Sequence, residues 1–144
     1  MSVDTIEDSF PSLNRNNYTV TSPEDFNYNC LAFALGDLHT WWEPPGQYGF
    51  CWPPGFSQDS SVETVTRIIK LHGYSVECGP NDSPLADSIA VFARNGEWTH
   101  FAKYVDGQWF SKIGEDHDIS HASLNLLESD LYGEVVRILS RPPK

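Results

Sequence analysis

The sequence predicts an α+β domain in which N-terminal helices pack on a mainly antiparallel sheet. Two helical patterns lie in the first half of the chain, at about residues 29–38 and 61–72. Strand patterns dominate the second half, where Asp106-Gly107 separates two of them as a two-residue hairpin turn does. Helices followed by hairpin-connected strands are typical of the α+β class.

The length of 144 residues suits one domain with one hydrophobic core. A hydrophobic fraction of 40% and an aromatic fraction of 13% argue against a disordered chain. We expect residues 1–25 to form an N-terminal arm and residues 26–144 to form the single domain.

The first predicted helix runs from about Asn29 to Leu38. Asn27 and Asn29 favour a turn or a helix start, and the apolar, helix-favouring run that follows begins with Cys30. The second helix begins at Ser60 and Glu63, which have the spacing of a capping box. It ends near Gly73, and one of its faces carries Val62, Val65, Ile68, Ile69 and His72.

The remaining segments predict strands with one late helix. Strands are expected at 74–78, at 88–98 running into an Asn-Gly turn, and on both sides of Asp106-Gly107. Residues 118–131 are predicted to be helical with Asp118 or Ser120 as cap, and residues 133–141 to form a last strand. The segment 39–57 holds four prolines and no usable period, which indicates an aromatic loop.

The net charge of −11 excludes several classes of partner. Phosphates would be repelled, so we expect neither nucleic-acid binding nor attraction to an anionic membrane. The acidic N-terminus has no signal-peptide pattern, and no apolar stretch approaches a membrane span. Cys30, Cys51 and Cys78 make an odd count without metal-type spacing, which favours a reduced, cytoplasmic protein.

Cys30 is the candidate nucleophile. At a helix start, backbone N–H groups and the helix dipole stabilise a thiolate. Such a cysteine needs a base within hydrogen-bond reach, and His100, at the start of a strand, is the candidate. The competing interpretation is structural, because free cysteine is often buried as a small apolar side chain, and a strand histidine often bonds a neighbouring carbonyl.

The third member of such a site must accept a hydrogen bond from the imidazole. A two-residue turn at Asp106-Gly107 places Ala102 opposite Ser111, so Ser111 shares a face with His100 and Lys112 points away. Asp116 and Asp118 follow that strand, and both can accept. We therefore predict Asp118 as the orienting residue, with Asn29, Ser111 and Asp116 in support.

Several short strings together resemble an uncharacterised family of bacterial domains of unknown function. These strings are YNCLAFALGD, WW, WPPG, ETV, GY, THFAKYVDGQWFSKIG, DISH and YG, and they span Tyr28 to Arg141. More distantly, a cysteine that opens a helix, followed by a histidine on a strand, resembles the papain-like superfamily. Its relevant branches are the bacterial cell-wall peptidases, the CHAP-type amidases and the transglutaminase-like hydrolases.

The papain-like resemblance implies Cys30 as nucleophile and His100 as base. Those families place His, Asn, Asp or Glu on the next strand, where this chain has Ser111 and Lys112. The expected function is a thiol hydrolase or acyltransferase that attacks an amide or ester bond of a peptide or protein substrate. The alternative is a non-enzymatic acidic interaction module, inhibitor-like or immunity-like, on the same fold without activity.

Two further groups complete the candidate residues. Trp41, Trp42 and Trp52 of the aromatic loop form either a core lid or the wall of a substrate groove. His117 and His121 lie four residues apart, as two zinc ligands can, but no distant ligand accompanies them, so they are too few for a zinc site. We therefore expect no metal and no cofactor.

Overall fold

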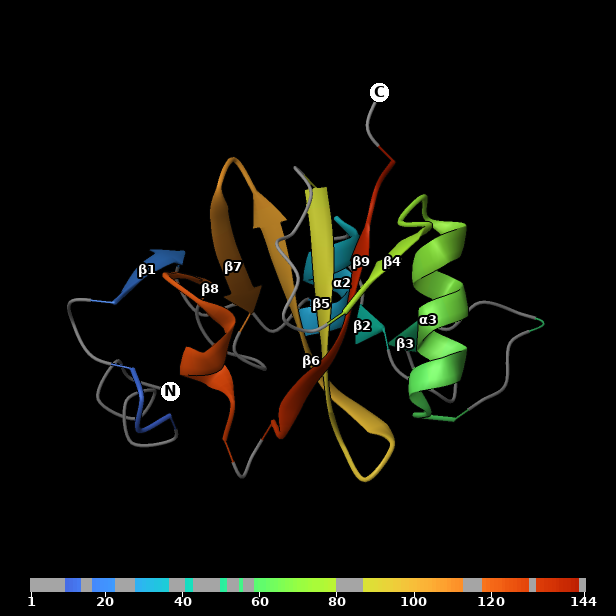
Figure 1. Cartoon of the computed structure of the whole chain (residues 1–144), viewed down its shortest axis with the longest axis horizontal. Coiled ribbons are helices and arrows are strands. Elements are labelled where there is room, and N and C mark those ends of the chain that lie inside the picture. The colour runs from blue at the N-terminus through green and yellow to red at the C-terminus, as the bar shows by residue number, and fades with distance from the viewer. Residues whose placement is uncertain are drawn as a thin grey trace.

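Seven antiparallel strands form one sheet in the order β1-β8-β7-β6-β5-β9-β4 (Figure 1). The computed structural model describes residues 10–13, 17–22, 28–36, 41–42, 50–51, 55, 59–79, 87–112, 118–129 and 132–142. The strands are β1 (Tyr18–Ser22), β4 (Val76–Cys78), β5 (Asp87–Arg94), β6 (Glu97–Val105), β7 (Gln108–Lys112), β8 (Asp118–His121) and β9 (Glu134–Ser140). A separate parallel pair joins β2 (Trp41–Trp42) to β3 (Phe50–Cys51).

The predicted papain-like α+β arrangement is wrong. The described part of the chain is mostly antiparallel sheet, with two short α-helices, α2 (Cys30–Leu35) and α3 (Val62–Leu71), and the 3₁₀ helix η1 (Leu124–Leu127). The sheet also begins before the helices, because β1, which falls within the predicted arm, pairs with β8. Both edge strands and β9 pair with strands distant in sequence, and no local pattern encodes such pairing.

Both helices begin at a side-chain cap. Asn29 caps α2 by accepting a hydrogen bond from the Ala32 N–H, and Gly36 ends the helix at φ 85°. This left-handed turn makes α2 shorter than the predicted 29–38. In α3 the cap is Ser61, one residue later than predicted, because its hydroxyl accepts from the Thr64 N–H.

The β6–β7 hairpin forms as predicted. Asp106 and Gly107 have φ values of 53° and 78°, as a two-residue type I′ turn requires, and Ala102 pairs with Ser111. The Asn95-Gly96 turn between β5 and β6 is confirmed in the same way, with φ values of 54° and 82°. Lys112 therefore lies on the opposite face of the sheet from Ser111.

The predicted helix at 118–131 is wrong. Residues Asp118–His121 form β8, which lies between β1 and β7, and all four side chains are buried. In a strand that is buried on both faces, polar and apolar residues do not alternate. Its sequence therefore lacks the usual strand pattern and is easily mistaken for a helix. The rest of the segment contains only the single 3₁₀ turn of η1.

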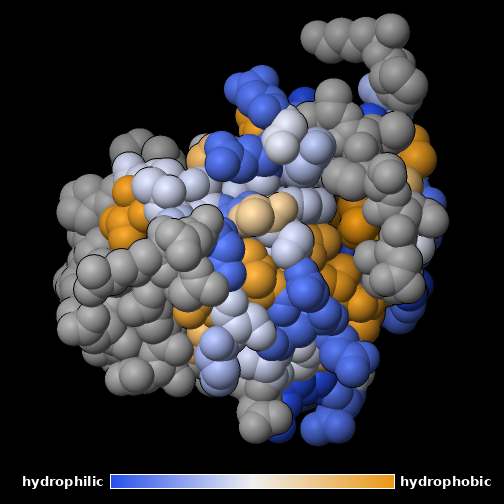
Figure 2. Space-filling model, turned by 60° about the vertical axis from the view of Figure 1, so that its left-hand side comes forward, coloured by the Kyte–Doolittle hydropathy of each residue, from blue (hydrophilic) through white to orange (hydrophobic). Residues whose placement is uncertain are grey.

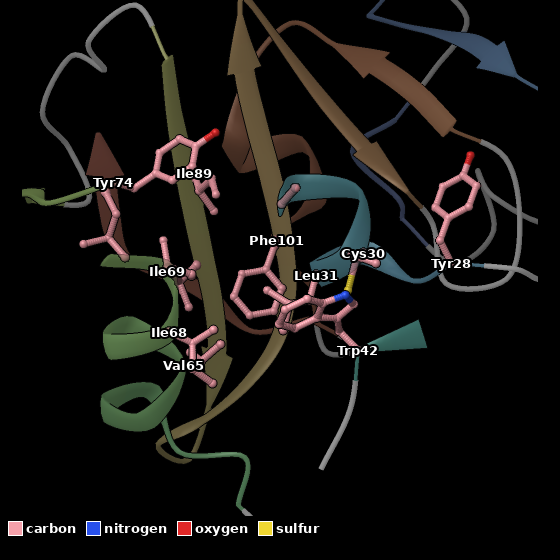
Figure 3. Packing of buried hydrophobic residues seen from close by; sticks show 14 residues of the cluster. Tyr28, Cys30, Leu31, Trp42, Val65, Ile68, Ile69, Tyr74, Ile89 and Phe101 are labelled. Carbon is pink, nitrogen blue, oxygen red and sulfur yellow. The ribbon is translucent and has the colours of Figure 1, made fainter. Parts of the chain in front are cut away.

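The sheet carries a hydrophobic cluster on each face. We call the face covered by α2 and α3 the helix face, where Leu31, Ile68 and Ile69 pack on Ile89 and Phe101 (Figure 3). On the other face, called the rear face, the buried core consists of Phe10, Leu13, Tyr18, Ala90, Phe92, Ala102, Trp109, Ile119, Leu127, Tyr132 and Ile138. Adjacent residues of one strand thus belong to different clusters.

Candidate functional site

Cys30 is the first residue of α2, as predicted, and it is buried on the helix face. Its side chain is 8% exposed and belongs to the same apolar cluster as Leu31, Trp42 and Phe101 (Figure 3). Asn29 holds this helix start in place, because its Oδ1 accepts the N–H groups of Ala32 and Trp42 and its Nδ2 donates to the Trp42 carbonyl. The helix start is therefore fixed to β2.

A buried polar cluster lies on the same face, where β7 and β8 pair. The Tyr28 hydroxyl donates to Asp118 Oδ2 at 2.7 Å, and Lys112 Nζ lies 4.8 Å from the centre of the Tyr28 ring. Lys112 and Asp118 occupy partner positions in the register of the two strands, and each is at most 6% exposed. The face of the Tyr28 ring attracts the Lys112 ammonium by a cation–π interaction, whereas Asp118 Oδ1 has no hydrogen-bond partner within the described part of the chain.

His100 lies on the rear face, across the sheet from Cys30. It pairs with Phe92, and its ring stacks on Tyr132 with the centroids 4.1 Å apart and the planes 4° from parallel. Both contacting rings belong to the rear-face cluster, whereas Cys30 belongs to the helix-face cluster. The predicted Cys30–His100 pair does not form, because alternation along β6 sends Phe101, and not His100, toward α2.

The environment of His100 is apolar. The side chain is fully buried, and within the described part of the chain neither ring nitrogen has a hydrogen-bond partner. Burial holds the pKa of His100 well below 6.5, and the nearby His121 lowers it further. A neutral imidazole between two aromatic rings packs as a core side chain.

Ser111 and His121 form a second polar pair on the rear face. His121 Nδ1 lies 3.0 Å from the Ser123 carbonyl, which can only accept, so Nδ1 carries the proton. His121 Nε2 then accepts from the Ser111 hydroxyl at 2.8 Å. Burial lowers the pKa of His121 to about 4, although the bond to the Ser123 carbonyl opposes this shift.

The predicted site residues thus separate into two groups. Cys30, Asn29 and Asp118 lie on the helix face, and His100 and Ser111 lie on the rear face. Trp42 is a buried core residue whose ring packs edge-on with His72. Asp116, Trp52 and His117 lie outside the described residues, and the side chain of Trp41 does as well.

Sequence reasoning missed two features of these groups. Lys112 was correctly placed away from His100, but nothing in the strand pattern indicated that α2 and Tyr28 cover it. The Ser111–His121 pair was missed because residues 118–131 were predicted to be helical. Among the described residues, no group of three His, Cys, Asp or Glu side chains is placed to hold a metal ion.

The comparisons with known proteins identify the family. Residues 19–140 match the family model described as Domain of unknown function (DUF7689). The chain belongs to this family. No curated protein and no solved structure matches the chain, so nothing supports the papain-like resemblance. Within the described part of the chain, no helix has the length and apolar character needed to cross a bilayer.

Proposed function

We propose that this domain is a non-enzymatic interaction module that binds a basic protein partner in the cytoplasm. The observation that carries the proposal is the separation of Cys30 from His100 by the sheet. A thiol is activated when its base lies within hydrogen-bond reach, and here the intended base packs between Phe92 and Tyr132. Cys30 then serves as a small buried side chain at the start of α2.

The buried polar cluster of the helix face has a structural role in this proposal. Lys112 and Asp118 are both buried at partner positions of β7 and β8, and Lys112 lies over the Tyr28 ring. Tyr28, two residues before Cys30, donates to Asp118, so the cluster ties the beginning of α2 to β7 and β8. We assign these buried contacts a role in fixing how the start of α2 docks on the sheet.

The charge of the chain supports a basic partner. Twenty acidic residues stand against nine basic ones. A surface of one dominant sign accelerates encounter with partners of the opposite sign and discourages partners of the same sign. Figure 2 shows hydrophilic and apolar side chains interspersed on one face of the molecule.

Peptide binding at two salt concentrations tests the proposal. Fluorescence polarisation would compare a labelled lysine-rich octapeptide with a glutamate-rich octapeptide of equal length, at about 0.02 M and about 0.3 M salt. We expect saturable binding of the lysine-rich peptide only, weakened at the higher salt concentration. Failure to bind it, or hydrolysis of an amide or ester substrate that Cys30→Ser abolishes, would overturn the proposal.

A further inference from the structure

A groove of about 950 Å³ opens at one end of the sheet, and its lining contains no residue of α2. Its walls come from the first turn of α3, the β5–β6 turn with the end of β5, and the η1–β9 connection with the start of β9. Figure 1 shows these three segments together at the lower end of the molecule, whereas the β6–β7 turn lies at the upper end. Segments distant in sequence thus build one surface.

The groove is held by backbone contacts between its walls. The Val62 N–H donates to the Gly96 carbonyl, and the Trp98 N–H donates to the Ser60 carbonyl at 2.9 Å. On the other side, Gly133 lies so close to β5 that a Cβ there would be 2.1 Å from the Ala93 oxygen. Backbone contacts of the fold therefore hold the walls of the groove together.

Carboxylates outnumber cations in this groove. The charged residues of the lining are Glu63, Glu128, Glu134, Arg94 and Arg137. The exposed Glu97, outside the lining, is the strand partner of Arg94 across the hairpin. Arg137 is neutralised, because its guanidinium binds Glu63 and Glu77 at 3.0 Å each. Among the described residues, Glu97, Glu134 and Arg94 make no ion pair, and all three are exposed.

The N-terminus of α3 does not make this groove an anion site. The Ser61 N–H and hydroxyl both donate to Asp59, and the Thr64 N–H donates to the Ser61 hydroxyl. These bonds lower the pKa of Asp59, so its negative charge stays beside the helix end. The partial positive charge of the helix terminus is thus met within the chain.

We propose that this groove takes a basic segment of the partner protein. The inference rests on the proposed function and assigns its binding site. A lysine or arginine of the segment would pair with Glu134, while its methylene stem would pack on Val136, an apolar side chain of the lining that is 39% exposed. The positive charge of Arg94 repels the basic segment and so weakens its binding.

Three single variants test the sign and the location of the interaction. Glu134→Gln removes a groove carboxylate, Arg94→Gln removes the groove cation, and Asp106→Asn removes a distant carboxylate. Because β6 has nine residues, Asp106 lies roughly 25 to 30 Å from Glu97, more than twice the Debye length of about 10 Å at about 0.1 M salt, where the variants are compared. Asparagine keeps the turn at residue 106, where φ is 53°.

The labelled lysine-rich octapeptide is the probe, with the full chain as receptor. We expect Glu134→Gln to weaken its binding about two- to fivefold, Arg94→Gln to strengthen it by a similar factor, and Asp106→Asn to leave it unchanged. Amide chemical shifts of residues 61–63, 94–97 and 133–137 should move on titration. Parent binding that the groove variants leave unchanged, with shifts elsewhere, overturns this site but not the proposed function, whereas absence of parent binding overturns both.

Discussion

Two buried histidines on the rear face are held neutral by different surroundings. His121 has a partner on each ring nitrogen, Ser111 on one side and the Ser123 carbonyl on the other. His100 has aromatic rings on its faces and edges, from Tyr132 and Phe92. Both pKa values are lowered chiefly because burial penalises the charged imidazolium.

The neutral histidines predict that stability falls on acidification. In the unfolded chain His121 titrates near 6.5, whereas in the folded protein its pKa is about 4. Below pH 6.5 the unfolded state therefore binds a proton that the folded state rejects, and stability is lost progressively down to about pH 4. The loss from His121 alone should reach roughly 3 kcal/mol, and His100 should add to it.

Urea unfolding at several pH values between 7.5 and 4.5 measures this loss. His121→Gln keeps a neutral side chain that can hydrogen-bond, and it should make the pH dependence shallower. His100→Phe should do the same while preserving the aromatic stack. A parent protein whose free energy of unfolding is flat across this range would contradict the assignment of two neutral buried histidines.

At the scale of elements, the entry into β9 depends on one close approach. Gly133 has φ 74°, and its α-carbon faces the Ala93 carbonyl and the Arg94 side chain. Its backbone also pairs with Ser129, where the chain turns from η1 into β9. This contact positions β9 beside β5 and so shapes one wall of the groove.

Gly133→Ala should therefore destabilise the protein more than a matched glycine substitution does. Gly107 has a similar φ of 78°, but a Cβ there would meet nothing within 4 Å. Gly107→Ala thus measures the backbone strain alone, and Gly133→Ala adds a steric clash of about 2 kcal/mol or more. Equal changes in the free energy of unfolding would show that the Gly133–Ala93 approach is not tight.

Local signals predicted some elements well. The two hairpin turns and the opening of α2 at Cys30 depend on neighbouring residues, and the last strand has a clear local strand pattern although its partners are distant, so each was visible in the sequence. The β8 strand was not, because Asp118–His121 gains its hydrogen bonds from β1 and β7, which are distant in the pattern. Long-range pairing overrode local helix propensity there.

At the scale of the whole molecule, the sheet determines which of the predicted site residues can lie close together. Alternation correctly separated Lys112 from His100, but it could not say which of the two faces α2 covers. Both faces of the central strands are buried, so both carry apolar residues, and the hydrophobic pattern does not indicate which face α2 covers. The α2 helix lies on the Lys112 face, so the predicted nucleophile and base are separated by the sheet.

The central claim is that Cys30 and His100 act independently of each other. Iodoacetamide alkylation of Cys30 measures this most directly, in a chain with Cys51 and Cys78 changed to serine, across pH 5 to 9. His100→Phe serves as the comparison, because it removes the imidazole and retains the stack with Tyr132. Far-UV circular dichroism confirms that each variant is folded.

We predict slow alkylation of native Cys30 at every pH in this range, with a rate that rises only when urea unfolds the chain. The His100→Phe variant should give the same profile, because His100 lies across the sheet from the thiol and is not placed to stabilise its thiolate. Rapid alkylation of the folded parent below pH 7, lost in His100→Phe, would contradict the account and restore a Cys30–His100 pair.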